Sequence, residues 1–278
     1  MTSRNIVSSE WLEAHLDAPD VVVLDASLYL PTDPRDPVAE YREAHIPGAL
    51  FFDIDEVADT ESDLPHMLPG PVEFSSMVRK MGIGDGQTIV IYDGAGLYSA
   101  ARAWWMFKTM GAEHVHVLDG GLPKWKAENR PLESGVETRP ERHFTARFNN
   151  DGVRSLDDVR SAIEEGHQIA DARSLARFNA EAPEPRPGVR GGHMPGAVSV
   201  HYCSLLNDGL SYKPNAEIEA IFRDAGIDPD KPIITTCGTG VTAAILALAL
   251  DEIGARHVAV YDGSWTEWGG RTDTPVVS

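Results

Sequence analysis

The two halves of this chain carry the same short segments in the same order, and this duplication constrains the fold more than any other feature of the sequence. The matching pairs are Val21-Val-Val-Leu-Asp-Ala with Gln168-Ile-Ala-Asp-Ala, His45-Ile-Pro-Gly-Ala with His193-Met-Pro-Gly-Ala, and Gly111-Ala-Glu-His-Val with Gly254-Ala-Arg-His-Val. Each pair is separated by about 145 residues, whereas the units of a solenoid are about 20–50 residues long. We therefore expect one module that occurs twice, as a first domain over 1–140 and a second over 141–278.

Each half alternates short runs rich in Val and Ile with longer stretches of helical periodicity. Such alternation is typical of βα units around a buried parallel sheet. The expected strands are 21–25, 89–92, 115–118, 168–171, 232–236 and 258–261. The expected helices are 9–15, 72–81, 99–110, 156–164, 216–225 and 242–253, and the stretch 131–150 is expected to link the domains. The predicted fold class is α/β, with two tandem domains that each hold a mostly parallel sheet flanked by helices.

The charge and composition of the chain argue against several classes of partner. Lys and Arg number 24 against 43 Asp and Glu, and the net charge of −19 repels nucleic acid and anionic lipid. The longest apolar run, Ala243 to Leu250, is far shorter than the roughly 20 residues of a membrane-spanning helix. The two cysteines form no CxxC pair, which argues against a zinc site and a disulfide scaffold. We expect a cytoplasmic protein with no nucleic-acid or membrane partner.

A short glycine-containing loop follows one strand in each half and leads directly into a helix. It reads Asp93-Gly-Ala-Gly-Leu-Tyr in the first half and Cys237-Gly-Thr-Gly-Val-Thr in the second. At this edge of a parallel sheet, backbone N–H groups and a helix N-terminus converge and favour a negative charge. Gly238 and Gly240 would let the backbone approach the sulfur, so Cys237 is a candidate thiolate nucleophile. The alternative is an inert buried cysteine beside a helix start, and Asp93 makes the first loop chemically silent.

Two other enzyme classes use loops of this type. Gly238-x-Gly240-x-x-Ala243 matches the dinucleotide fingerprint, and Asp262 lies near the spacing of a ribose contact. Too few residues follow Asp262 to complete a nucleotide-binding half. A cysteine-dependent phosphatase would need an arginine in the loop to clamp the phosphate, and this loop has none. Both classes are therefore disfavoured.

Several other conspicuous side chains are expected to be structural. His45 and His193 occupy the same position of the repeat, so each should serve the fold of its own domain. His114 and His116 alternate on a strand and lack a third metal ligand at a fitting spacing. Cys203 has no glycine loop beside it and is expected in the core.

Motifs spread over nearly the whole chain carry a family resemblance. They are Glu40-Tyr-Arg-x-x-His45-Ile-Pro-Gly-Ala, Phe51-Phe-Asp-Ile-Asp55, His66-Met-Leu-Pro-Gly, Trp104-Trp-Met-Phe, Asp119-Gly-Gly-Leu-Pro-Lys-Trp125, Arg177-Phe, Pro183-Glu-Pro-Arg186, Gly192-His-Met-Pro-Gly and Cys237-Gly-Thr-Gly-Val-Thr242. Taken together, they resemble the two-domain rhodanese-like sulfurtransferases, and within that family the 3-mercaptopyruvate sulfurtransferases. The resemblance implies two similar α/β domains, of which the first is inactive and the second bears a persulfide-forming cysteine.

The resemblance also implies a reaction and a substrate site. The thiolate of Cys237 would take the sulfur of 3-mercaptopyruvate, release pyruvate and pass the sulfur to a thiol, thioredoxin or cyanide. No metal or organic cofactor would be needed. The carboxylate of the substrate would be bound by Arg177 and Arg186, next to a loop formed by Gly238, Gly240, Val241 and Thr242.

A proton relay is a further implication of the resemblance. The hydroxyl of Thr239 would work with His66 and Asp55, which lie in the first half of the sequence. Relatives often carry serine at the position of Thr239. Threonine keeps the hydroxyl but restricts its rotamer.

Two alternative functions stay open. Relatives specific for thiosulfate carry basic residues directly after the cysteine, whereas this chain has Gly238 and Thr239 there. The absence of these cations favours a monoanion such as mercaptopyruvate over a dianion, and leaves a thiosulfate sulfurtransferase as the alternative. A non-catalytic module could also use the same loop only to bind sulfide or another anion.

Overall fold

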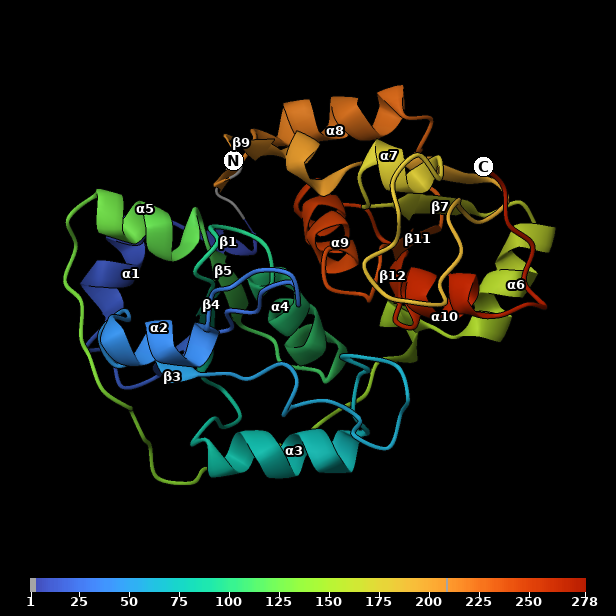
Figure 1. Ribbon diagram of the computed structural model, residues 1–278. Helices are drawn as coiled ribbons and strands as arrows, with labels where there is room; N and C mark the ends of the chain where they lie inside the picture. Colours follow the sequence, from blue (N-terminus) through green and yellow to red (C-terminus); the bar gives the residue numbers. More distant parts are fainter. Residues whose placement is uncertain (1–3, 209) are drawn as a thin grey trace. The chain divides into compact units, whose positions relative to one another are not determined.

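The computed structural model describes residues 4–208 and 210–278, and the chain divides into two compact units (Figure 1). The first unit holds residues 4–60, 68–149, 208 and 210–212, and the second holds residues 61–67, 150–207 and 213–278. The main division therefore falls between Asn149 and Asn150, after the expected division between 140 and 141. A short segment, 61–67, belongs to the second unit although it lies in the first half of the sequence.

The first unit is built on a five-stranded sheet with the order β1-β5-β4-β2-β3, in which every neighbouring pair is parallel. Its strands are β1 Ile6–Val7, β2 Val21–Asp25, β3 Leu50–Phe51, β4 Thr88–Tyr92 and β5 Val115–Leu118. Its helices are α1 Ser9–His15, α2 Pro37–Glu43, α3 Pro71–Lys80, α4 Ala100–Thr109 and α5 Gly121–Ala127. The central strand β4 leads through a short loop into α4.

The second unit repeats this plan with the sheet order β6-β12-β11-β7-β8, again parallel throughout. Its strands are β6 Val153–Arg154, β7 Gln168–Asp171, β8 Ala197–Ser199, β11 Ile233–Thr236 and β12 Val258–Tyr261. Its helices are α6 Leu156–Glu164, α7 Leu175–Phe178, α8 Asn215–Asp224, α9 Ala243–Glu252 and α10 Ser264–Gly270. Shorter elements of this unit are the 3-10 turns η1 Asn150–Gly152 and η2 Tyr202–Leu205 and the strand β9 Leu206–Asn207, whereas the strand β10 Ser211–Tyr212 belongs to the first unit.

The shared strand order confirms the predicted fold class and the duplication. Each expected strand and helix is present, with ends within one residue of the expected ones. The edge strands β1, β3, β6 and β8 were not predicted, because two or three residues are too few to show a periodicity. Helices α5 and α10 were missed because each starts at a residue in the left-handed region, Gly121 at φ +53° and Ser264 at φ +49°.

The stretch 131–150, expected as a linker, lies along the first unit. The Arg142 N–H donates to the Arg79 carbonyl at 3.2 Å, and the Arg147 N–H donates to the Met110 carbonyl at 2.8 Å. A segment without helix or sheet must pair its backbone N–H and C=O groups elsewhere. These hydrogen bonds supply partners for them. They explain why the division between the units comes after this segment.

The core of each unit is packed around the central strand and the helix that follows it. In α9 the whole run from Ala243 to Leu250 is buried, which fits a helix that is apolar on all sides. In α4 the buried residues include Trp104 and Trp105. Among the residues that the structure describes, no helix combines the length and the apolar content that crossing a bilayer requires. Both central helices are thus core helices, and each fixes the position of the loop at its N-terminus.

Equivalent buried aspartates end the strands β2 and β7, but their partners differ. The Asp171 carboxylate pairs with the buried Arg173 guanidinium at 2.7 Å. In the first unit Ser27 takes the place of Arg173, and its hydroxyl donates to Asp25 at 2.5 Å. Burial raises the pKa of Asp25 to about 6, because the hydrogen bonds from Ser27 compensate only part of the cost of desolvating a carboxylate.

This raised pKa predicts that the first unit becomes less stable as the pH rises from about 4 to about 6. In that window the folded state keeps the proton on Asp25, whereas the unfolded state has released it. Asp25→Asn should remove this part of the pH dependence, because the amide is neutral throughout. Urea unfolding at several pH values measures the effect, and Asp20→Asn, at an exposed position just before the same strand, is the control. Identical profiles for wild type and Asp25→Asn would contradict the assignment.

Candidate active site

Cys237 lies between the central strand β11 and the buried helix α9, and its side chain is only 2% exposed. Asp93 occupies the equivalent position between β4 and α4 and is fully buried. The two loops share their backbone conformation at the second glycine, since Gly96 and Gly240 both have positive φ, +108° and +78°. The fold therefore places a carboxylate and a thiol at the same point of two similar loops.

The first loop shows how the backbone at this strand-to-helix junction binds an anion. Four backbone N–H groups converge on the Asp93 carboxylate. Ala95 donates to Oδ1 at 2.9 Å, and Tyr98, Ser99 and Ala100 donate to Oδ2 at 2.8–2.9 Å. Such a ring of amides at a helix N-terminus stabilises negative charge. The first loop is thus an anion site that is filled by its own side chain.

In the second loop the equivalents of Ala95 and Tyr98, the N–H groups of Thr239 and Thr242, are unused within the described chain, whereas the Ala244 N–H, the equivalent of that of Ala100, donates to the Val241 carbonyl at 3.3 Å. The backbone N–H groups of residues 238–242 donate to no acceptor among the residues that the structure describes. Buried or partly buried N–H groups are normally paired, so these donors mark a place where a ligand or a modified side chain is expected. Cys237 is the residue directly before these N–H groups in the chain. The arrangement favours a functional cysteine over the inert buried cysteine that the sequence left open.

Three residues at the start of α10 hold the Cys237 segment in place. The Trp265 N–H donates to the Cys237 carbonyl at 2.9 Å, and the Thr266 N–H and hydroxyl donate to the Gly238 carbonyl at 2.9 and 2.8 Å. The Ser264 hydroxyl accepts the Cys237 N–H at 3.3 Å and donates to the Tyr261 carbonyl at 2.8 Å. These contacts hold the Cys237 segment against the start of α10.

Ser264 was missed by the sequence analysis. It adopts a left-handed conformation that costs a serine about 1 kcal/mol or more, whereas the first unit has Gly121 there. The hydrogen bond to Cys237 explains why a side chain is kept at this position. A comparison of the two repeats could have found it, since the matched segments read Asp119-Gly-Gly and Asp262-Gly-Ser.

Arg177, on α7, lies against the loop. A Cβ atom added to Gly238 would come within 3.1 Å of its guanidinium, so the glycine leaves room for this cation. The guanidinium also pairs with Glu184 at 2.5 Å, and Glu184 is shared with the buried Arg173. Arg177 is therefore positioned by a carboxylate and keeps part of its positive charge for a second anion.

Arg186 has a different environment. It is half-buried, and it makes no hydrogen bond or ion pair with any described residue. Its charge is thus uncompensated within the described part of the chain. A guanidinium in this state is available to bind a carboxylate from solution.

The residues of the expected proton relay fall in different units. His66 belongs to the segment 61–67 of the second unit, the unit of Cys237, and it adopts a left-handed conformation with φ +61°. Thr239 is half-buried in the Cys237 loop. Asp55 is exposed and belongs to the first unit. Val241 and Gly240 are buried, and Thr242 is half-buried at the start of α9.

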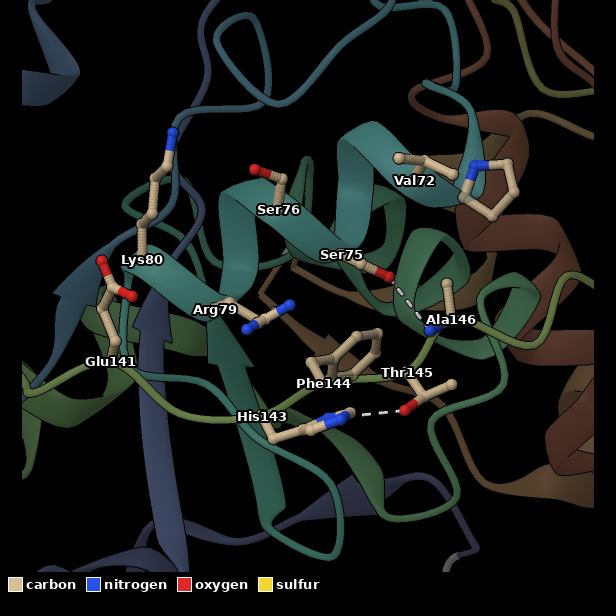
Figure 2. A pocket seen from close by; sticks show the side chains of 11 residues that line it. Val72, Ser75, Ser76, Arg79, Lys80, Glu141, His143, Phe144, Thr145 and Ala146 are labelled. Carbon is tan, nitrogen blue, oxygen red and sulfur yellow. Dashed lines mark hydrogen bonds between the residues drawn. The ribbon is translucent and has the colours of Figure 1, made fainter.

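A separate hollow of about 620 Å³ lies in the first unit, between α3 and residues 141–146 (Figure 2). Its lining includes the cations Arg79 and Lys80 and the exposed Val72. The Ser75 hydroxyl faces across it and accepts the Ala146 N–H at 3.1 Å. None of the site residues expected from the sequence lines this hollow, so it is distinct from the Cys237 loop.

The anion site of the first unit leads to a prediction. Asp93→Ala would leave two buried and two partly buried N–H groups without an acceptor and should lower the free energy of unfolding by about 3 kcal/mol. Asp36→Ala is the control, because Asp36 caps the exposed start of α2 through two N–H groups and should cost only about 1 kcal/mol. Urea unfolding followed by fluorescence gives both values. Equal losses in the two variants would show that the loop amides do not need the anion.

The comparisons with known proteins agree with this geometry. Residues 8–128 and 155–271 each match the model of the rhodanese-like domain. The chain is 45% identical over 278 residues to 3-mercaptopyruvate sulfurtransferase of Escherichia coli K12, covering 99% of both chains. It is 42% identical over 299 residues to thiosulfate/3-mercaptopyruvate sulfurtransferase 1 of Arabidopsis thaliana, covering 100% of this chain and 79% of that one.

A solved structure shows the same fold. The crystal structure of an Escherichia coli protein, described with the rhodanese fold and catalytic mechanism of 3-mercaptopyruvate sulfotransferases, superimposes with a TM-score of 0.86. The two chains are 43% identical, and the match covers 94% of this chain and 98% of that one. Fold and sequence thus point to the same family.

Proposed function

The chain belongs to the rhodanese-like family, and on this basis we propose that it is a 3-mercaptopyruvate sulfurtransferase that works through a persulfide on Cys237. Relatives that carry this enzyme name and are 45% and 41% identical to the chain support the enzyme class. The persulfide step is supported by the unused N–H groups around Cys237. The second unit is the catalytic one in this proposal, and the first, with Asp93 in place of cysteine, is inactive.

The observation that carries the proposal is the comparison of the two loops. Asp93 presents an anionic oxygen two bonds from its Cβ atom, and backbone amides bind that oxygen. A persulfide on Cys237 would present its anionic outer sulfur two bonds from the equivalent Cβ atom. The loop N–H groups that stay unused in the second copy, such as that of Thr242, are thus suited to bind the outer sulfur of a persulfide. Preorganised donors of this kind stabilise the charge without reorganisation.

The reaction would proceed in two transfers. The Cys237 thiolate attacks the sulfur of 3-mercaptopyruvate, so that a sulfur–sulfur bond forms and the carbon–sulfur bond breaks. The electron pair of the broken bond goes to the enolate of pyruvate, which takes up a proton. An acceptor thiolate then attacks the outer sulfur, and Cys237 leaves as a thiolate. Over the two steps the substrate carbon keeps the electron pair of the broken bond and the acceptor thiol becomes a persulfide, so no external oxidant or reductant is needed.

Thr239, His66 and Asp55 are proposed to supply the proton in the first transfer. The Thr239 hydroxyl belongs to the Cys237 loop, and His66 lies in a segment of the same unit. Histidine is suited to such a transfer near neutral pH. Asp55 would orient the histidine, and its part in the relay rests on the family resemblance alone.

Arg177 and Arg186 are proposed to bind the carboxylate of the substrate. Arg177 lies against Gly238, next to the reacting sulfur, and Arg186 has no competing carboxylate among the described residues. Two such cations oppose the net charge of −19 that would otherwise repel an anionic substrate. Gly238 and Thr239 bring no further cation, which favours mercaptopyruvate over thiosulfate.

The acceptor is proposed to be a thiol, with thioredoxin and cyanide as further candidates. Both cysteines are free thiols, Cys237 buried and Cys203 exposed rather than in the core as expected. A reducing compartment keeps thiols in this state, so a cytoplasmic location is proposed.

Cys237→Ser should abolish pyruvate release from 3-mercaptopyruvate, because a hydroxyl is neither ionised at neutral pH nor a soft nucleophile for sulfur. Wild type treated with 3-mercaptopyruvate should gain the mass of one sulfur atom, which dithiothreitol removes. Cys203→Ser is the matched control and should behave as wild type. A binding module would gain no sulfur, and a higher kcat/KM for thiosulfate than for mercaptopyruvate would favour the alternative donor.

Arg186→Ala and Arg177→Ala should each raise the KM for 3-mercaptopyruvate about 10- to 100-fold, the effect of losing a charged hydrogen-bonding partner. Alkylation of Cys237 by the neutral reagent iodoacetamide should change much less. Glu184 would stay paired with Arg173 in Arg177→Ala, so the fold should be kept. Arg223→Ala, on the surface of α8, is the control. Unchanged KM in both site variants would remove their assigned role.

A further inference from the structure

The ring of His45, in the first unit, has one nitrogen without a partner. His45 is fully buried. Its Nδ1 lies 2.7 Å from the Tyr41 carbonyl, and since a carbonyl only accepts, Nδ1 must carry the proton. The other nitrogen, Nε2, is then a bare lone pair in the neutral ring, and it has no hydrogen-bond partner. A buried polar atom in this state needs a physical explanation.

Two carboxylates lie beside this nitrogen. A ligand atom of His45 and carboxylate oxygens of Glu133 and Glu137 all lie within 4.8 Å of one another. The backbone fixes the first pair, because the His45 N–H donates to the Glu133 carbonyl at 2.8 Å and the Glu133 N–H donates back at 2.9 Å. Among the residues that the structure describes, neither carboxylate has an ion-pair partner.

The ring geometry directs Nε2 towards these carboxylates. The His45 and Tyr41 rings stack with centroids 4.3 Å apart and planes 20° apart. Nδ1 lies at the backbone end of Tyr41, so Nε2 lies towards the hydroxyl end. The Tyr41 hydroxyl accepts the Glu137 N–H at 3.1 Å, which places Glu137 at that same end.

A proton on Nε2 does not explain the arrangement. A protonated imidazole would donate to a carboxylate, yet the His45 ring makes neither a hydrogen bond nor an ion pair with the carboxylate of Glu133 or Glu137 in the described chain. A bare nitrogen lone pair and two anionic oxygens are all acceptors and repel one another. One Glu133 oxygen, Oε2, already accepts the Gly48 N–H at 2.8 Å. A cation placed between the three groups would satisfy the nitrogen and the remaining carboxylate oxygens.

We propose that His45, Glu133 and Glu137 form a binding site for a divalent transition-metal ion such as Zn²⁺. One imidazole and two carboxylates with room for water are a usual ligand set for such ions. The Nδ1–H bond to the Tyr41 carbonyl is the contact that typically orients a metal-binding histidine. Ligand atoms around tetrahedral Zn²⁺ lie roughly 3.4 Å apart, so the glutamates would move inward slightly. Glu133 is exposed and Glu137 half-buried, which leaves them free to do so.

The second unit provides an internal comparison. His193 has the same place in the repeat, its Nδ1 lies 3.0 Å from the Phe178 carbonyl, and its ring stacks on Phe178. Its backbone pairs with Val277 through bonds of 2.7 and 2.9 Å, as that of His45 pairs with Glu133. The valine offers no ligand atom. The histidine and its strand partner therefore fold without carboxylates, and the two glutamates are an addition specific to the first unit.

The site would connect His45 to the non-repetitive segment after Pro131. His45 comes just after the end of α2, and the glutamates belong to the segment that lies along the first unit. A bound ion would hold these parts together and stabilise the first unit by linkage, because the unfolded chain does not preserve the ligand set. This role is independent of the sulfur chemistry proposed for Cys237.

Equilibrium dialysis against Zn²⁺ tests the proposal, with protein alkylated by iodoacetamide so that Cys203 and Cys237 do not compete for the metal. The wild type should bind one Zn²⁺ per chain in the micromolar range, and its Tm should rise with added Zn²⁺. The double variant Glu133→Gln/Glu137→Gln should bind at least about tenfold more weakly and lose the Tm rise. Pyruvate release by the unalkylated variant should match that of wild type.

The control is Glu141→Gln/Glu181→Gln, which removes the same charge from two exposed acids and should bind Zn²⁺ as wild type does. The glutamate variants are preferred to a change of His45, whose burial makes a folding defect expected. Equal Zn²⁺ affinity in the wild type and the Glu133→Gln/Glu137→Gln variant would overturn the site. The absence of micromolar binding to the wild type would overturn it as well.

Discussion

The structure depends on what happens to backbone amides where a central strand ends and a buried helix begins. The strand and the helix are both fixed by the core, so the loop between them must turn sharply and expose its N–H groups on one side. These donors need an anion. In the first unit the chain supplies one, the Asp93 carboxylate, and the loop is closed to other ligands. In the second unit Cys237 stands in its place, and the N–H groups of residues 238–242 have no acceptor among the described residues.

The surroundings of the second loop follow from this requirement. The unused N–H groups of this loop make no bond that could hold it in place. The loop is therefore held through its carbonyl groups instead. Trp265 and Thr266 donate to the carbonyls of Cys237 and Gly238, and Ser264 accepts the Cys237 N–H from a strained backbone conformation. In the first unit Gly121 suffices at the position of Ser264. There a Cβ atom would come within 2.6 Å of the Asp93 carbonyl.

The sequence predicts the parts of this molecule whose stability is local or periodic. Central strands such as β4 and helices such as α6 show apolar periodicity or a capping signal, so their ends were predicted within a residue. The edge strands exist only because a neighbour pairs with them, and no local pattern marks such pairing. The same division holds at the site. Cys237 and its glycines are visible in a loop motif, whereas Ser264 acts through a hydrogen bond across 27 positions. The roles of Arg186 and Asp55 remain predictions.

The duplication shows how one scaffold comes to hold opposite charges. The first unit places carboxylates at the shared positions: Asp93 in the loop, Asp25 without an arginine, and Glu133 beside His45. At the matching places the second unit has Cys237, the pair of Asp171 with Arg173, and Val277. In the second unit the Arg177 guanidinium lies against Gly238, beside the Cys237 loop. In a chain with a net charge of −19, the binding of an anionic substrate that we propose depends on local cations, Arg177 and Arg186. In the first copy Asp93 occupies the loop donors, Asp25 has a raised pKa, and Glu133 is a ligand of the proposed cation site.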